Sequence, residues 1–214
     1  MAWKVEPRLP WSVAPGEGLM LQTGSKVRLA QRSDEAEVIS LVRVMHAESG
    51  LFPLDDERVR QTLARVWERK GGILALIGAP GEIRAMLLMQ LATVWYTSET
   101  HLDETFCWVH PDHRRSDYSK ILLEYAKHTS DLLTQRAGKK IPLIIGVLTS
   151  MQMAAKVRLY RRFLGIPVGA FFVHNADWVA KQQPAEEDYW RIPRLSKLLS
   201  KQTHLMLQKR EKVS

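Results

Sequence analysis

The stretch that decides the fold spans residues 104–122 and reads ETFCWVHPDHRRSDYSKIL. Its apolar start predicts a strand that continues through Val109 and stops at Pro111, followed by a basic loop and then a helix. The first amides of a helix have no partner within the helix and lie at the positive end of its dipole, so this loop is a natural anion site. Arg114 and Arg115 add fixed charge and paired donors suited to a diphosphate.

Outward from this stretch, hydrophobic periodicity predicts alternating strands and helices. The strand–helix–strand steps late in the chain imply a parallel pair of strands within an otherwise antiparallel sheet. In chain order, the expected elements are a strand from Lys26, helices from Ser33 and Asp55, strands 73–77, 83–97 and 104–110, a helix 117–135, a strand 143–148, a helix 152–164 and a strand 168–173.

Composition indicates one folded domain between two different ends. The chain has 214 residues, 45% hydrophobic and 25% charged, close to globular averages. Prolines and glycines mark residues 1–25 as an irregular arm, residues 26–175 hold the domain, and residues 176–214 predict a basic helical extension. Seven basic residues and one acidic residue lie in 191–214, so this tail carries +6 of the chain's +8. We expect it to attract nucleic acid or another acidic partner, or to be the solvated face of a helix.

Cysteine and histidine usage limits the chemistry. Cys107 is the only cysteine, which excludes an intramolecular disulfide and a cysteine metal cluster. His101, His110 and His113 match no common metal-ligand spacing, so no metal is expected. The first ten residues contain no apolar run of signal-peptide length, and no run approaches the roughly 20 residues of a membrane span. These features predict a cytoplasmic protein with no membrane association.

The loop then suggests a family. Val109, Pro111 and Arg114, followed by a helix, resemble motif A of the GNAT superfamily of acyl-CoA-dependent N-acyltransferases. In that family the loop reads Gln/Arg-x-x-Gly-x-Gly/Ala, and its amides hold the pyrophosphate of coenzyme A. The resemblance covers about residues 26–175. It implies the GNAT fold, an α/β (α+β) fold with a mixed, mostly antiparallel sheet of about six to seven strands and helices on both faces. The coenzyme-binding residues that it implies are Val109, Arg114, Arg115, Ser116, Asp117, Tyr118 and Ser119.

The loop departs from the family pattern at two positions. Asp117 stands where the first glycine is expected, and Ser119 stands where glycine or alanine is expected. Glycine there allows the backbone to approach the phosphates closely, whereas Asp117 brings a negative charge toward them. Asp117 could instead cap the helix with its carboxylate. Loops that depart in this way occur in some GNAT proteins of bacteriophages, which leaves a bacteriophage-type member open.

A second segment supports the resemblance. Residues 155–165 look like the Leu-Tyr-x-x-x-Gly-Phe segment of the family, with one residue more between Tyr160 and Gly165. In the family this tyrosine often protonates the departing coenzyme A thiolate, so Tyr160 is the candidate general acid. A buried tyrosine that only packs is the alternative.

Glu104 is the candidate general base that removes the proton of the amine. Alternation along a regular strand places Glu104 on one face with Leu102, Phe106 and Trp108, and Cys107 on the other. If that face borders the cleft, burial should raise the pKa of Glu104 toward a useful range. Three nearby acids, Glu48, Asp55 and Asp56, could attract a cationic amine or start helices, and Trp95 and Tyr96 could line the acceptor cleft or pack in the core.

Together these features predict an enzyme that transfers an acetyl group from acetyl-CoA to an amine, by direct attack in a ternary complex. The acceptor is a small-molecule or protein amine that the sequence does not name. Two alternatives remain: a GNAT-like binding module without turnover, which Asp117 favours, and a nucleic-acid-directed modification protein, which residues 191–214 favour. A homodimer is also open, because GNAT domains often dimerise.

Overall fold

The computed structural model describes residues 26–147, 153–165, 167 and 169. The chain divides into two units after Pro167, and all the helices and strands described here belong to the first. In chain order they are β1 (Val27–Leu29), the 3-10 turn η1 (Arg32–Asp34), α1 (Glu35–Ser49), α2 (Asp56–Trp67), β2 (Gly72–Ile77), β3 (Ala85–Thr93), β4 (Thr100–Val109), the 3-10 turn η2 (Pro111–His113), α3 (Tyr118–Ala137), β5 (Leu143–Ile145) and α4 (Met153–Leu164).

The five described strands form one sheet in the order β1-β2-β3-β4-β5. The first four pair antiparallel, and β4 and β5 pair parallel, since α3 connects them as a crossover. The β2–β3 connection turns back at Gly78, which has a φ of +115°. A Cβ atom there would lie 2.1 Å from the carbonyl oxygen of Glu82, so only glycine fits.

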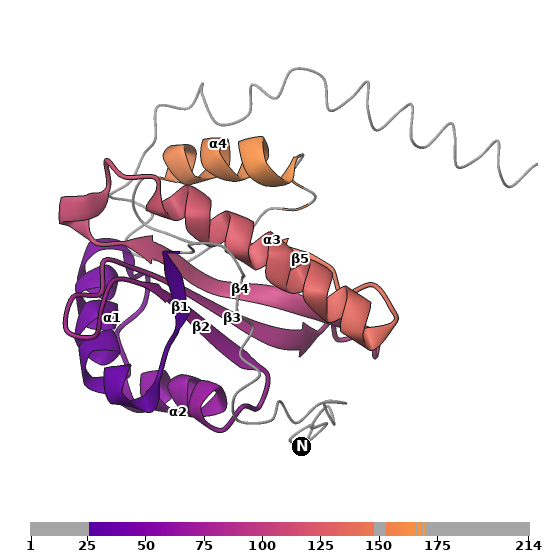
Figure 1. The fold of residues 1–214 in the computed structure, drawn as a ribbon, viewed down its shortest axis with the longest axis horizontal. Coiled ribbons are helices and arrows are strands. Elements are labelled where there is room, and N and C mark those ends of the chain that lie inside the picture. Colours follow the sequence, from indigo (N-terminus) through magenta and orange to yellow (C-terminus); the bar gives the residue numbers. More distant parts are fainter. Residues whose placement is uncertain (1–25, 148–152, 166, 168, 170–214) are drawn as a thin grey trace, which may run out of the picture. The chain divides into compact units, whose positions relative to one another are not determined.

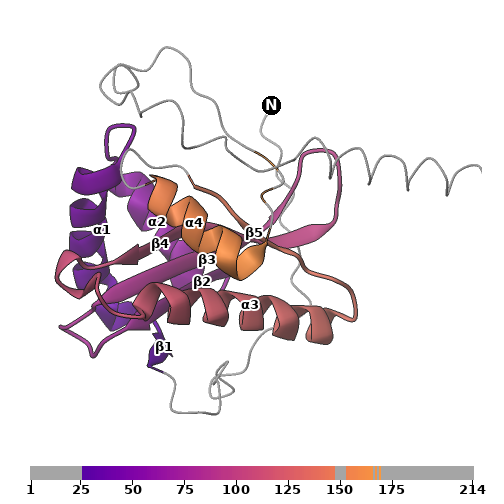
Figure 2. The same cartoon turned by 90° about the horizontal axis from the view of Figure 1, so that it is seen from above.

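Helices cover both faces of the sheet. Figures 1 and 2 show α1 and α2 on one face and α3 on the other. Strand residues alternate between two apolar clusters, as the strand period of two requires. Leu87 and Met89 pack in the α3-side cluster with Leu122. Met86 and Leu88 pack in the cluster on the α1 and α2 side.

The predicted fold class is confirmed, and so is the order of elements through α4. The strand predicted at 83–97 is shorter, because residues 94–99 form the β3–β4 connection, and the strand predicted from Glu104 starts at Thr100. The strand predicted at 168–173 and most of the predicted extension lie outside the described residues, so the six- to seven-strand count and the domain limits stay predictions.

Candidate active site

The candidate site is built on β4, whose two edges differ. The edge toward β3 is paired along the strand except at Thr105. The edge toward β5 is paired only at residues 102–104. Within the described part of the chain, residues 105–109 therefore have no strand partner on this side. We call this the open edge of β4.

The backbone of Val109 faces the open edge. The N–H of His110 donates to the carbonyl oxygen of Arg84 at 2.8 Å, on the β3 side. Because successive residues of a strand direct their N–H and C=O groups to alternate edges, Val109 directs both groups away from β3. Val109 thus offers a donor and an acceptor beside the gap that β5 leaves, as its predicted coenzyme-binding role requires.

A β-bulge sits next to this gap. Glu104 is opposite Met89, but Phe106 is opposite Leu88, so Thr105 is one extra residue in β4. The extra residue reverses the alternation of the strand. The prediction that Glu104 shares a face with Phe106 is therefore wrong: Leu102, before the bulge, and Cys107, after it, pack in the same α3-side cluster, whereas Phe106 packs on the α1 and α2 side.

Glu104 is a buried acid at the last β4–β5 pair, where its partner is Ile145. Its exposure is 9%, and burial raises its pKa to about 7. The positive charge of Lys156 opposes this rise, the negative charge of Asp103 adds to it, and the backbone amides of Gly146 and Cys107, which donate to the carboxylate, oppose it. The predicted rise in pKa is thus present, although the surroundings of Glu104 differ from those expected.

Helix α4 presents two side chains to this acid. Lys156 and Tyr160 are four residues apart, so they lie on the same face of the helix. Burial raises the pKa of the Tyr160 hydroxyl, and the charges of Glu104 and Cys107 raise it further. Tyr160 therefore stays protonated at neutral pH and is a proton donor close to Glu104. Lys156 is a site residue that the sequence analysis missed, and its signal was the four-residue spacing from Tyr160.

A cavity of about 200 Å³ lies along the open edge. Cys107 and Val109 line it from β4, Ser119 from the start of α3, and Lys156 and Leu159 from α4. Burial raises the pKa of the Cys107 thiol to about 12, so this thiol is protonated and is no nucleophile at neutral pH.

The two arginines of the loop have different surroundings. Arg114 lines the same cavity and donates from Nη2 to Oε2 of Glu48 at 2.5 Å. Trp108 Nε1 donates to the same oxygen at 3.1 Å, so Glu48 joins the loop to α1. Arg115 is exposed and forms no hydrogen bond or ion pair with the described residues. Of the two loop arginines, Arg115 is thus the one without a partner among the described residues.

The side chain of the N-cap residue does not cap α3. Asp117 occupies the N-cap position, but its carboxylate accepts no hydrogen bond from the first turn. It lies 3.7 Å from Lys26 Nζ instead. The hydroxyl of Ser116 donates to the carbonyl oxygen of His113 and accepts from the N–H of Tyr118. The prediction that Asp117 could cap α3 with its carboxylate is therefore not met, and the anionic group sits in solvent beside the helix start.

The structure also shows the surroundings of the residues considered for the acceptor side. Asp55 caps α2 by accepting from the N–H groups of Glu57 and Arg58, and Asp56 pairs with Arg43 at 2.6 Å. Trp95 and Tyr96 belong to the β3–β4 connection and are 94% and 71% exposed. They contact each other edge to face and are not core residues.

Comparisons with known proteins give similarity at the level of the fold. No protein-family model matches the sequence, and no curated protein matches it. A possible acetyltransferase from Clostridium difficile 630 aligns with 70% of this chain and 96% of its own, at a TM-score of 0.54 and 13% identity. The ribosomal-protein-alanine N-acetyltransferase from Brucella melitensis biovar Abortus 2308 aligns with 69% of this chain and 96% of its own, at a TM-score of 0.52 and 14% identity. The aminoglycoside antibiotic 6'-N-acetyltransferase from Acinetobacter haemolyticus aligns with 69% of this chain and 94% of its own, at a TM-score of 0.50 and 16% identity.

This chain has the GNAT fold. At 13–16% identity the likeness concerns the fold, and it does not bear on the bacteriophage type. Within the described part of this chain, no helix has the length and hydropathy that crossing a bilayer needs. Among the same residues, no three His, Cys, Asp or Glu side chains are grouped so that they could hold a metal ion.

Proposed function

We propose that this GNAT domain is an N-acetyltransferase that moves the acetyl group of acetyl-CoA to an amine, by direct transfer in a ternary complex. The observation that carries the proposal is the position of Glu104. A buried carboxyl group with a pKa of about 7 lies where β4 and β5 diverge, close to a protonated tyrosine. Acids and bases tuned to neutral pH in this way are typical of catalytic sites.

The residues along the open edge fit the coenzyme. Val109 offers a backbone donor and acceptor of the kind that the amide groups of the coenzyme arm need, and the adjoining cavity extends to the start of α3. Ser119 is small, and the α3 amides and unpaired Arg115 suit a diphosphate. Arg114 can contribute only while it shares its charge with Glu48. Acetyl-CoA thus supplies the activated acetyl group as co-substrate.

Glu104 and Tyr160 then divide the proton transfers. The ionised Glu104 takes the proton of the ammonium group, and the free amine forms a bond to the acetyl carbonyl carbon. The carbon–sulfur bond breaks, and the phenolic proton of Tyr160 passes to the sulfur. The nitrogen then loses its second proton, which returns to the Tyr160 phenolate, so the products are the amide, the free thiol of coenzyme A and protonated Glu104. Because the pKa of Glu104 is about 7, a substantial part of the enzyme has the ionised base at neutral pH.

A second function is favoured by one observation. Asp117 places an exposed carboxylate at the start of α3, and among the described residues its ion pair is with the exposed Lys26, across 3.7 Å. This charge opposes anion binding at the helix start, and a domain that binds a partner without turnover is the function left if the coenzyme does not bind. The alternative of a nucleic-acid-directed modification protein depends on residues 191–214, which lie outside the described residues.

Calorimetric titration with acetyl-CoA tests the proposal. We expect binding in the micromolar range, weakened about tenfold, or 1.4 kcal/mol, in Arg115→Ala. Arg136→Ala, an exposed arginine in the last turn of α3, is the matched control and should bind as the parent does. Absence of binding at millimolar acetyl-CoA would overturn the proposal in favour of the binding module. Equal binding by all three proteins would remove the loop from the coenzyme site.

A further inference from the structure

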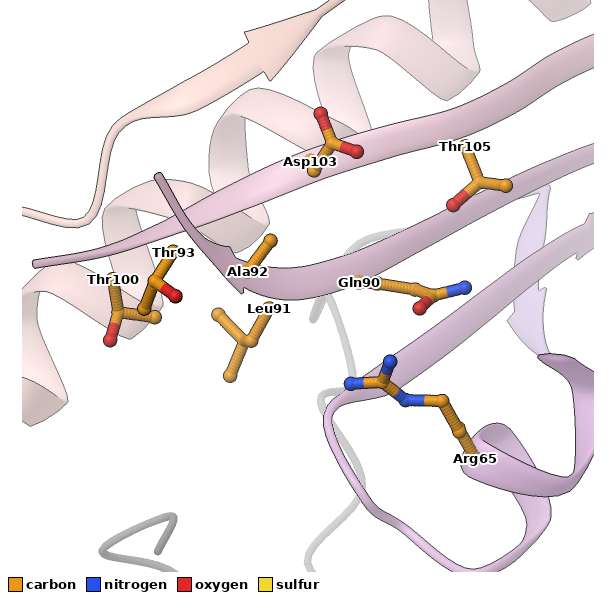
Figure 3. Close-up of a pocket in the computed structure, with 8 residues that line it drawn as sticks. All are labelled: Arg65, Gln90, Leu91, Ala92, Thr93, Thr100, Asp103 and Thr105. Atoms are coloured by element: carbon orange, nitrogen blue, oxygen red, sulfur yellow. The ribbon is translucent and has the colours of Figure 1, made fainter. Parts of the chain in front are cut away.

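A second cavity, of about 260 Å³, lies on the α1 and α2 side of the sheet. Its polar lining comes from three elements. Figure 3 shows Arg65 of α2 on one side, Asp103 and Thr105 of β4 on the other, and Gln90 of β3 between them. Thr93 and Thr100 close the end near the β3–β4 connection. We call it the Asp103 cavity.

The charged groups of this cavity have no partner in the described structure. The side chains of Arg65, Gln90 and Asp103 form no hydrogen bond or ion pair with any described residue. Burial raises the pKa of Asp103, and only the nearby charge of His101 opposes the rise. A half-buried carboxylate without a donor is costly, and a ligand that donates to it removes the cost.

The Asp103 cavity borders the backbone on either side of the proposed catalytic base, whose side chain points to the other face of the sheet. Asp103 and Thr105 are the two chain neighbours of Glu104, so their Cα atoms lie about 3.8 Å from its own. Thr105 is the bulge residue and also the first residue after the last β4–β5 pair. A ligand whose end rests against Thr105 therefore reaches the point where the two strands diverge, from the face opposite α3.

Size and charge define the ligand. The volume is below the roughly 300–1,000 Å³ of pockets for drug-sized ligands, so the occupant is small or is the end of a larger molecule. Arg65 and Asp103 stand at opposite sides, with the amide of Gln90 between them and threonine hydroxyl groups beside Asp103 and at one end. A purely cationic ligand pairs with Asp103 but is repelled by Arg65, whereas a ligand with an ammonium and an anionic group satisfies both.

We propose that the Asp103 cavity binds the acceptor, and that this acceptor is a small zwitterionic amine. Its ammonium group lies toward Asp103 and Thr105, and its carboxylate or other anionic group lies toward Arg65. The inference rests on the proposed acetyl transfer for the meaning of "acceptor". The binding of the zwitterion itself does not depend on it.

Titrations of the full-length ¹⁵N-labelled protein, without coenzyme, test this inference. The probes are straight-chain ω-amino acids from glycine to 6-aminohexanoate, each compared with the diamine of the same chain length. We expect at least one amino acid to shift the amide signals of Gln90, Asp103 and Thr105, with a Kd at least tenfold below that of its diamine. Arg65→Gln should remove this preference, and Asp103→Asn should weaken both ligands. Arg58→Gln, two turns earlier on α2 and outside the cavity, should change neither.

Two results would overturn the inference. One is a diamine that binds as well as its amino acid, which makes the site one for polycations. The other is the absence of shifts at these amides throughout the series. In either case, acetyl-CoA titration of the same sample shows whether the proposed function still stands. Conversely, if an amino acid binds but acetyl-CoA does not, the zwitterion site is supported and the proposed acetyltransferase function is overturned.

Discussion

The two halves of β4 differ in what their backbone does. Residues 100–104 lie beside β3, and β5 pairs with the last three of them, whereas residues 106–109 are paired only with β3 among the described strands. The first half is thus the interior of a sheet, where backbone groups are satisfied by neighbours. The second half keeps one row of backbone groups for a ligand. Glu104 is the last residue of the first half, and the bulge at Thr105 separates the two.

The largest effect should follow from removing the acid at this junction. Glu104→Gln keeps the shape of the side chain but cannot accept a proton, so we expect kcat for acetyl transfer to fall about 10²- to 10⁴-fold. Activity of the parent should rise as the pH increases through about 7, because Glu104 works ionised. The variant should lack this rise. Steady-state kinetics between pH 5.5 and 9 measure both.

Asp103→Asn is the control for this prediction, because Asp103 is the adjacent acid on the opposite face. It should raise KM for the amine and keep the rise of kcat with pH, with its midpoint moved to lower pH because the charge of Asp103 helps to raise the pKa of Glu104. If kcat of Glu104→Gln depends on pH as kcat of the parent does, another group is the base. Glu104 and Asp103 would then not differ in their catalytic role.

A smaller effect concerns stability. The pKa of Glu104 rises from 4.5 to about 7 on folding, so the native state keeps a proton that the unfolded state releases in this window. Stability is therefore lost as the pH rises from 4.5 to 7, by about 3 kcal/mol for this one group. Glu104→Gln has no such titration. Relative to the parent, the free energy of unfolding of the variant should therefore increase by up to about 3 kcal/mol between pH 4 and pH 8. Urea denaturation at a series of pH values measures this difference.

The exposed acid Glu124 of α3 provides the matched variant, Glu124→Gln, whose difference from the parent should stay nearly constant with pH. If Glu104→Gln also tracks the parent at every pH, the carboxyl group is solvated in the folded protein. That outcome would place Glu104 with the surface acids and not with the buried half of the strand.

The smallest effect lies beyond the end of β4. Asp117→Asn removes one negative charge from the start of α3, so acetyl-CoA should bind about two- to fivefold more tightly, with the gain reduced by salt. The exposed pair with Lys26 contributes little to stability, and the unfolding midpoint should hardly move. Calorimetry at low and high salt measures the change. Weaker binding would show that the Asp117–Lys26 pair orders the loop for the coenzyme.

The order of elements could be read from the sequence because it depends on local signals. The buried strand 73–77, the apolar stripe of α3 and the proline that stops β4 each act within a few residues, and the structure has β2, α3 and the strand end there. The tyrosine of α4 and the acid of β4 also came from short segments. The proximity of Tyr160 to Glu104 depends on the whole fold, and only the resemblance to the GNAT superfamily suggested it.

The bulge could not be read in the same way. A one-residue excess in a strand depends on its register with the neighbour, and the run from Leu102 to Val109 alternates equally well with or without it. Simple alternation therefore assigned Glu104 to the face of Phe106. Pairing of Arg114 with Glu48 across 66 positions, and the exposure of Trp95, likewise depend on contacts far apart in the chain.

The single thiol of the chain gives the open edge a built-in chemical reporter. Cys107 is 8% exposed and its burial keeps it protonated, so a thiol reagent reacts with it only after a local opening of the structure. Because the chain has no second cysteine, the labelling rate counts those openings at one place, between β4 and α4. A ligand bound along the open edge makes these openings rarer and slows the labelling of Cys107. The labelling rate therefore measures how much of the site is occupied, even when the reaction is not known.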